Sequence, residues 1–247
     1  MSLHLVELSL DMRALHLWVG GRKFGQAFDE GQALHHLLGE VFGAAVLQPF
    51  RLMVAPRAQT GTIYAYATQD AESLRAVAMG SLTPGQADLL GLKQMRSLPR
   101  PTDTWRGSQR IGFDLRVRPV VRLASNLVGK NDAGVPVNFR KGAELDAFLA
   151  HVLRGGEISR EQVYLDWLAQ RIGAVAEIVP AITRMASFQR TVIQRGGKRL
   201  EGPDAVMHGT LSIVDPAGFT ALLAKGIGRH KSYGYGMLLL RPAQKLV

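Results

Sequence analysis

The order of secondary-structure segments is the feature that most constrains how this chain folds. Residues 3–10 alternate apolar and polar side chains, as in a strand with one buried face, and residues 30–43 space their apolar side chains as an amphipathic helix does. The patterns that follow predict two hairpin strands, a short helix and a closing strand, over residues 49–56, 61–68, 70–80 and 113–121. Prolines argue for irregular structure over residues 82–110. The order β-α-β-β-α-β is that of a ferredoxin-like domain.

The second half of the chain repeats this order after a connector at residues 122–141. Helices are predicted over residues 143–154, after the Ser159 and Gln162 capping box, and from Asp215-Pro216 to Gly226. The segments AVAEIVPAI, SFQRTVIQ, AVMHGTLSIV and GMLLLRP are typical of strands. We therefore predict an α+β fold of two tandem ferredoxin-like βαββαβ domains, over residues 1–121 and 122–247. Sheets of this kind have one open face, which commonly binds RNA.

The charge of the chain indicates a polyanionic partner. Thirty Lys and Arg residues stand against 20 Asp and Glu residues in 247, a formal net charge of +10. A charge excess of this size favours binding to nucleic acid or to an anionic membrane surface. More of the excess lies in the second half of the chain, which has 17 basic and 10 acidic residues.

Basic residues concentrate around one predicted hairpin. SFQRTVIQRGGKRLEG is typical of a strand, a Gly-Gly turn and a returning strand. Its cations are Arg190, Arg195, Lys198 and Arg199. A basic hairpin tip of this kind reaches into a nucleic-acid groove. The alternative is an ordinary solvated face of the protein.

A glycine-rich segment near the C-terminus, GIGRHKSYGYG, is a second candidate for phosphate binding. It matches neither a dinucleotide fingerprint, because a helix precedes it and Lys231 stands where a glycine is needed, nor a P-loop. Glycines let a phosphate approach backbone N–H groups, and Lys225, Arg229, His230 and Lys231 lie beside them. The alternative is a turn required by the sheet geometry.

Several classes of chemistry are not expected. The chain has no cysteine, so disulfides and thiolate metal sites are excluded. Its seven histidines form no HExxH or HxH spacing, and we predict no metal and no cofactor. No GxSxG nucleophile motif occurs. The N-terminus does not resemble a signal peptide, and no apolar run of about 18 residues predicts a membrane span, so we expect a cytoplasmic protein without membrane contact.

One histidine stands out on the first predicted helix. His35 lies at the edge of the apolar stripe, with Gly31 and Gly39 one turn away in either direction. Glycines at these positions weaken the helix by roughly 1 kcal/mol each relative to alanine. We expect open space around the imidazole, where a substrate backbone can lie. The alternative is a histidine with a structural role only.

The second half of the chain is similar to a known family. The tail GTLSIVDPAGFTALLAKGIGRHKSYGYGMLLLRP resembles the C-terminal glycine-rich signature of the CasE-type CRISPR RNA endoribonucleases, the repeat-processing subunits of the type I-E Cascade complex. Further similarity lies in FDLRVRPVVR followed by Gly129-Lys130, in AELDAFLAHVL with EQVYLDWLAQRIG, and in the SFQRT, RGG and GPDAVMHGTL segments. The first half resembles the family mainly through its element order and the Leu34-His35 helix.

The resemblance implies two RRM-like domains that bind the stem-loop of a CRISPR repeat. It further implies cleavage at the 3′ base of the stem without metal, after which the protein stays bound to the hairpin as a subunit beside the other Cascade subunits. The family's catalytic histidine falls on His35, but Gln32 stands where the family has a tyrosine. The family's stem-binding hairpin falls on Arg190, Arg195, Lys198 and Arg199.

Metal-free cleavage of this kind uses the 2′-hydroxyl of the RNA as nucleophile. The reaction needs a proton acceptor, a donor for the leaving oxygen and cations near the phosphorane, and it leaves a 2′,3′-cyclic phosphate. We predict His35 as acid or base and Lys130 as a stabilising cation. Two alternatives remain open: a weak or inactive subunit that binds the RNA hairpin, and a basic protein that docks on other proteins or DNA.

Overall fold

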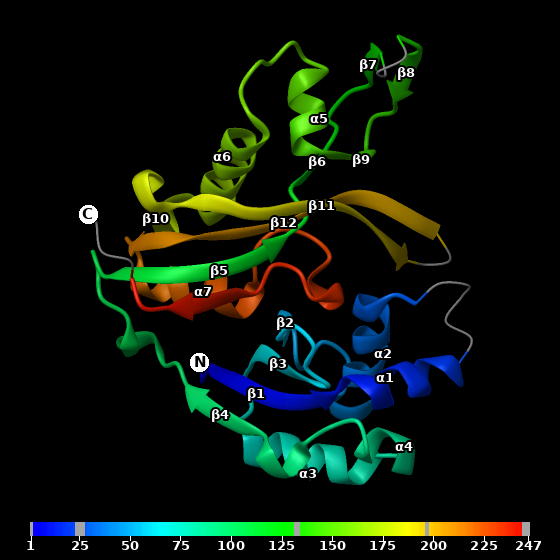
Figure 1. Ribbon diagram of the computed structural model, residues 1–247. Helices are drawn as coiled ribbons and strands as arrows, with labels where there is room; N and C mark the ends of the chain where they lie inside the picture. The colour runs from blue at the N-terminus through cyan, green and yellow to red at the C-terminus, as the bar shows by residue number, and fades with distance from the viewer. Residues whose placement is uncertain (1, 23–27, 131–133, 196–197, 244–247) are drawn as a thin grey trace.

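The computed structural model describes residues 2–22, 28–130, 134–195 and 198–243, and it contains two antiparallel sheets, one above the other in Figure 1. The first sheet has the strand order β2-β3-β1-β4. Its strands are β1 (His4–Asp11), β2 (Phe50–Val54), β3 (Thr60–Ala67) and β4 (Arg96–Pro99). The helices of this unit are α1 (Met12–Gly20), α2 (Glu30–Phe42), α3 (Ala71–Ser81) and the short α4 (Pro84–Ala87). The apolar sides of α2 and α3 pack in one core with β1 and β3.

The second sheet has the strand order β10-β12-β5-β13, and β11 also pairs with β12. Its strands are β5 (Arg110–Val117), β10 (Ala176–Ile178), β11 (Arg184–Arg195), β12 (Lys198–Ile213) and β13 (Leu238–Arg241). Helices α6 (Arg160–Ile172) and α7 (Pro216–Lys225) share the core of this sheet. Both units therefore have the βαββαβ order and the strand arrangement of a ferredoxin-like fold, which confirms the predicted fold class.

An insertion follows β5 and stands at the top of Figure 1. It consists of two small antiparallel pairs and one short helix: β6 (Val120–Arg122) with β9 (Glu144–Asp146), β7 (Leu127–Lys130) with β8 (Pro136–Phe139), and α5 (Ala147–Val152). The segment predicted as a connector thus contains a hairpin. Its Gly129 lies against Leu153, where a Cβ atom would clash.

Capping side chains and glycines mark the ends of the helices, and the predicted Ser159 cap and Pro216 start are confirmed. The Asp29 carboxylate accepts a hydrogen bond from the Gln32 N–H at 3.0 Å and caps α2, which ends at Gly43 with φ +99°. Ser159 caps α6 in the same way, and Gly173 ends it with φ +61°. Helix α7 starts at Pro216 as predicted, although the Asp215 side chain makes no capping hydrogen bond.

The prediction that residues 113–121 close the first unit is wrong. β5 is a central strand of the second sheet, between β12 and β13. All residues from Ile111 to Leu115 are buried, as expected for a strand covered on both faces. The fourth strand of the first sheet is β4, which lies in the segment predicted to be irregular. It is an edge strand, where Pro99 is tolerated. The two sheets separate between β4 and β5, before the division expected at residue 121.

The two units share buried contacts. The Tyr66 hydroxyl on β3 donates to the Leu238 carbonyl on β13 at 3.0 Å, and Arg51 on β2 pairs with Asp114 on β5 at 3.4 Å. Gly226 lies against Pro49, so the start of the glycine-rich loop also touches the first unit. These contacts fix α2 relative to the second sheet. In the described residues, no helix is both long and apolar enough to cross a bilayer.

Candidate functional site

Helix α2 presents His35 at its surface. The helix buries Leu34, Leu37 and Leu38 on its inner side, while His35 and His36 are exposed. The helix also contacts β11 and the 3-10 helix η5 (Lys231–Tyr233), which belongs to the glycine-rich loop. His35 therefore lies where the first helix, the loop and the basic hairpin come together.

The aromatic ring of Tyr233 is the notable neighbour of His35. The two ring centroids are 5.4 Å apart with an interplanar angle of 33°, and His36 lies at the same centroid distance on another side. Tyr233 was not among the site residues predicted from the sequence. An aromatic residue between glycines of an expected surface loop was the available signal, but its pairing with a helix about 200 residues away was not visible in the sequence.

The expected open space on both sides of His35 is present only on one. A Cβ atom at Gly31 would lie 2.7 Å from the Tyr233 carbonyl oxygen, so the loop fills the space on the N-terminal side. A Cβ atom at Gly39 would meet nothing within 4 Å. Gly39 and His35 line a small hollow together with Ser232 and Phe50. Gly31 therefore allows the loop to approach, and Gly39 leaves the C-terminal side of His35 uncovered.

The surroundings of His35 favour its neutral form. Partial burial of the imidazole lowers the pKa of His35 below 6.5, and the nearby charge of His36 lowers it further. At pH 7 the ring is therefore mostly neutral. The neutral imidazole is the form that can accept a proton, and its conjugate acid is a better proton donor than that of an unperturbed histidine.

The glycine-rich loop is anchored to the insertion. The His230 side chain is only 1% exposed, and its Nε2 lies 2.6 Å from a Glu144 carboxylate oxygen. Arg229, which is half-exposed, pairs with the same carboxylate. Lys231 donates to the Lys225 carbonyl at 2.7 Å. His230 thus holds the loop in place from inside the protein, whereas Arg229 and Lys231 remain accessible to a ligand.

The basic hairpin β11–β12 runs above α2 in Figure 1. Arg190 is exposed and donates to Glu201 at 2.8 Å, which raises the pKa of the guanidinium. Arg199 is exposed near the same carboxylate. Arg195 and Lys198 are opposite each other in the backbone register of the two strands, at the end of the hairpin. Residues 196 and 197 lie outside the described residues. An exposed ion pair such as Arg190 and Glu201 stabilises a protein by only about 0–1 kcal/mol, so a phosphate can compete with Glu201 for the arginine.

Charged and polar side chains hold the base of this hairpin, and none of them was among the site residues predicted from the sequence. Arg116 on β5 forms a two-point contact with Asp204 on β12, at 2.9 and 2.6 Å. The Tyr235 hydroxyl donates to the same carboxylate at 3.3 Å, and Arg118 donates to the Leu200 carbonyl at 3.3 Å. These residues fix the hairpin relative to the loop.

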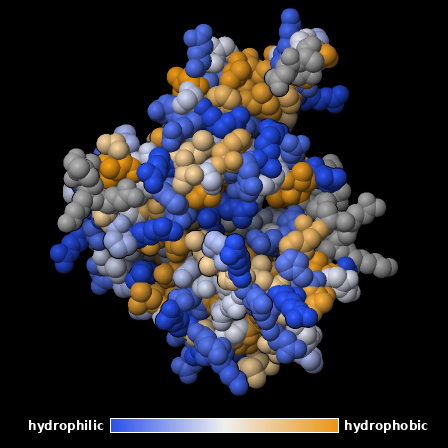
Figure 2. Space-filling model, in the orientation of Figure 1, coloured by the Kyte–Doolittle hydropathy of each residue, from blue (hydrophilic) through white to orange (hydrophobic). Residues whose placement is uncertain are grey.

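Lys130 does not join this site. It is exposed at the end of β7, which stands in the insertion on the other side of β11–β12 from α2 in Figure 1. Figure 2 shows hydrophobic side chains on this outgrowth, and among its exposed residues are Val128 and Val135. The structure therefore places His35 beside Tyr233 of the loop, on a helix that also contacts β11, whereas Arg190 lies on the side of the hairpin that faces Asp146 and Tyr164, and Lys130 lies in the insertion.

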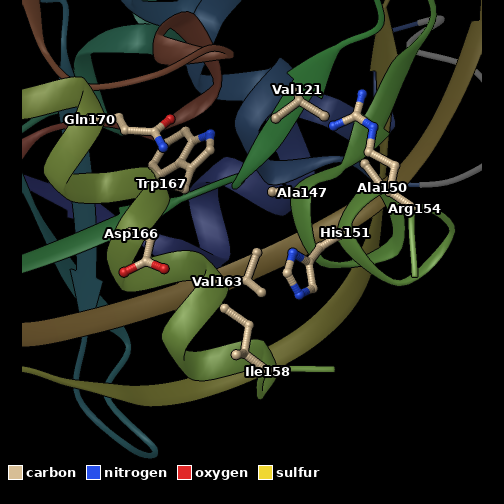
Figure 3. Close-up of a pocket in the computed structure, with 10 residues that line it drawn as sticks. All are labelled: Val121, Ala147, Ala150, His151, Arg154, Ile158, Val163, Asp166, Trp167 and Gln170. Atoms are coloured by element: carbon tan, nitrogen blue, oxygen red, sulfur yellow. The ribbon is translucent and has the colours of Figure 1, made fainter. Parts of the chain in front are cut away.

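A cavity between α5 and α6 is also separate from His35 (Figure 3). It is lined by apolar residues and by His151, Arg154 and Asp166. The side chains of His151 and Asp166 do not point toward one another in Figure 3, and Asp166 accepts a hydrogen bond from Gln162 at 2.8 Å. The cavity shows no pair of groups arranged for acid–base chemistry. Within the described ranges, no three His, Asp or Glu side chains gather in a way that could hold a metal ion.

The two glycines of α2 provide a matched test of the site geometry. We expect Gly31→Ala to lower the free energy of unfolding by about 1–3 kcal/mol, because the added methyl group overlaps the backbone of Tyr233. Gly39→Ala should instead raise it by up to about 1 kcal/mol, because alanine is the better helix former and the space is open. Urea denaturation of both variants measures the difference. Equal stabilisation by the two substitutions would contradict the packing of the loop on α2.

Comparisons with known proteins identify the family. The family model described as CRISPR associated protein matches residues 3–242, and the chain belongs to this family. A search of curated proteins gives no match. These findings confirm the predicted family resemblance.

Solved structures with the same fold are similar over nearly the full length of the chain. A structure of the CRISPR endoribonuclease Cse3 bound to a 19-nucleotide RNA is 18% identical, covers 98% of this chain and 100% of that one, and has a TM-score of 0.64. The CRISPR-associated protein Cas6e from Escherichia coli K-12 is 17% identical over 97% and 99% of the two chains, with a TM-score of 0.54. A chain of a CRISPR RNA-guided surveillance complex in a pre-nicking state is 18% identical over 97% and 99%, with a TM-score of 0.56.

Proposed function

We propose that this protein is an endoribonuclease that processes CRISPR precursor RNA. It binds the stem-loop of the repeat, cuts at the 3′ base of the stem and stays bound to the hairpin as a subunit of a Cascade complex. The family match, the fold shared with an RNA-bound CRISPR endoribonuclease and the net charge of +10 support this proposal. The exposed imidazole of His35, beside Tyr233 on the helix that contacts β11, is the observation that carries it.

The proposed reaction requires no metal. The 2′-hydroxyl of the nucleotide before the cut attacks the adjacent phosphorus, the bond to the 5′-oxygen breaks, and a 2′,3′-cyclic phosphate and a 5′-hydroxyl result. His35 either takes the proton from the 2′-hydroxyl or gives one to the leaving 5′-oxygen. In this proposal the ribose lies at the protein surface, over the side of His35 that Gly39 leaves uncovered. The bound stem holds the reacting oxygen in line, which supplies a large part of the rate.

Cations around the hollow bind the RNA backbone in this proposal. Arg190, Arg195, Lys198 and Arg199 of the hairpin contact phosphates of the stem. Arg229 and Lys231 belong to the loop that carries Tyr233, the neighbour of His35, and bind phosphates on that side. Phosphate contacts of this kind make binding sensitive to salt.

A cleavage assay with a cognate repeat RNA in excess EDTA tests the function. We expect full cleavage in EDTA, a product that ends in a 2′,3′-cyclic phosphate, and no cleavage of an RNA with a 2′-deoxy nucleotide before the cut. The deoxy RNA should still bind, since only the nucleophile is missing. Cleavage of the deoxy RNA, or loss of cleavage in EDTA, would contradict the proposed mechanism.

One observation favours a second candidate function, a subunit that binds the hairpin with weak or no catalysis. Gln32 occupies the position of the family's tyrosine, and its Oε1 is buried without a hydrogen-bond partner in the described structure. The Tyr233 ring lies against His35 from a different element and restores an aromatic neighbour to the histidine. Tight hairpin binding without cleavage in the same assay would identify the second function.

A further inference from the structure

A cavity lined by basic side chains lies where α7 ends and the glycine-rich loop begins. Its volume is about 330 Å³. Five basic side chains line it, from β6, from the end of α6, from α7 and from the loop, and no acidic residue does: Arg122, Arg171, Lys225, Arg229 and Lys231. Three of these, Arg122, Arg171 and Lys225, play no part in the site around His35.

The charges in this cavity are largely uncompensated. Arg229 pairs with Glu144, but in the described residues none of the other four cations has a carboxylate within ion-pair distance. Arg171 is held over the Trp167 ring at 5.2 Å, and Arg122 donates to the Gly142 carbonyl at 3.2 Å. Burial and the nearby Lys225 charge lower the pKa of Lys231. An anion in the cavity would stabilise all of these groups.

The backbone of the loop is shaped to form one wall of the cavity. Gly226 and Gly228 both have positive φ angles, +70° and +78°, which glycine adopts without strain. A Cβ atom at Gly228 would lie 2.9 Å from the Trp167 ring, so the loop can approach α6 this closely only with glycine at position 228. This close approach brings Arg229 and Arg171 to the same cavity.

One short helix, η5, connects the cavity to the surroundings of His35. Lys231 lines the cavity and Tyr233 contacts His35, and both belong to η5. The three residues of a 3-10 helix span roughly 6 Å. Neighbouring nucleotides of one RNA strand can therefore contact His35 and the cavity at the same time.

We propose that this cavity binds the phosphates of single-stranded RNA that continues from the stem past the cleavage site, with Arg122, Arg171 and Lys225 as additional ligands. Its volume admits a nucleotide backbone but not a duplex, so the occupant is the single-stranded segment. The inference rests on the proposed function, because it assigns a further part of the same RNA. It gives the protein a separate contact for the flank of the hairpin.

Binding measurements with two RNAs test this proposal. One RNA is the repeat hairpin alone, and the other carries a short single-stranded extension at its 3′ end, past the cleavage site. The His35→Ala background keeps the RNA uncut. The test variant is Arg171→Ala/Lys225→Ala, and the matched control is Lys93→Ala/Arg106→Ala, which removes two exposed cations outside the cavity. The quantity compared is the ratio of the Kd of the hairpin to the Kd of the extended RNA.

We expect the extension to tighten binding in the parent and the control, and the ratio to fall toward one in the test variant. The slope of log Kd against log salt for the extended RNA should fall by about 1.4 more in the test variant than in the control, as for two lost contacts with single-stranded phosphates. An extension that adds no affinity in the parent, or equal ratios in the test and control variants, would overturn the cavity proposal while hairpin binding stands. Failure of the parent to bind the hairpin would overturn the proposed function and this inference together.

Discussion

His35→Ala should lower the rate of repeat RNA cleavage by about 10²–10⁴-fold, the contribution expected of a group that transfers a proton in the transition state. Hairpin affinity should change little, because His35 is a single exposed side chain and the cations of the hairpin and the loop remain. Single-turnover cleavage with protein in excess measures the chemical step. A parallel binding titration shows that the variant still holds the RNA.

The neighbouring histidine is the matched control. His36→Ala removes an exposed imidazole from the same turn of α2 and should leave cleavage measurable. The charge of His36 contributes to the lowered pKa of His35, so this variant should move the pKa of His35 back toward 6.5. If His36→Ala abolishes cleavage and His35→Ala does not, the catalytic assignment moves to the other histidine.

The pH dependence separates the two possible proton transfers. Because the pKa of His35 is lowered, the inflection in the cleavage rate should lie below pH 6.5. If His35 is the base, its neutral form is active, and the rate rises with pH up to the pKa and is constant above it. If His35 is the acid, its protonated form is active, and the rate falls as pH rises through the pKa. In either case the inflection in the His36→Ala profile should lie at a higher pH than in the parent.

Local sequence patterns predicted most of the fold because the signals involved are themselves local. Ser159, Pro216 and Gly226 start or end helices through contacts within a few residues. The assignment of β5 to the first unit was wrong because strand pairing depends on distant partners. A run of buried residues is equally compatible with either sheet, and the short edge strand β4 carried a proline that argued against a strand.

The same distinction applies to the candidate site. His35 was predictable from its helix and its glycines, and the family resemblance pointed to the same residue. The approach of Tyr233 to Gly31 and the burial of His230 against Glu144 depend on chain segments far apart in sequence. Lys130 was predicted to stabilise the phosphorane at His35, but the insertion that contains it stands away from α2.

Asp114 is the clearest case of a residue whose role only the folded structure reveals, and its substitution should be strongly destabilising. Its carboxylate is almost fully buried and lies near two arginines and a histidine: Arg241 at 2.6 Å, Arg51 at 3.4 Å and His208 at 3.1 Å. Arg241 and His208 are partly exposed and can be solvated, but the Arg51 side chain is only 10% exposed. Asp114→Asn would leave Arg51 buried without this partner.

Loss of one partner of a buried ion pair typically costs about 3–5 kcal/mol. We expect a decrease of this size in the free energy of unfolding of Asp114→Asn, measured by urea denaturation. The exposed pair of Glu7 and Arg96 provides the control, because Glu7→Gln should cost only about 0–1 kcal/mol. The double variant Asp114→Asn/Arg51→Met removes the unpaired cation and should recover part of the loss. A double variant no more stable than Asp114→Asn would show that Arg51 is not the source of the cost.

This ion pair also connects stability to the proposed site. Arg51 lies on β2 and Asp114 on β5, so the pair joins the two sheets, and β2 contacts η5, which carries Tyr233. Weakening it should loosen the loop on α2 as well as the interface between the units. We therefore expect Asp114→Asn to cut repeat RNA more slowly than the parent even at temperatures where both are folded, with part of the rate returning in the Asp114→Asn/Arg51→Met variant. A fully folded Asp114→Asn protein with the parent's rate would mean that the interface does not position His35.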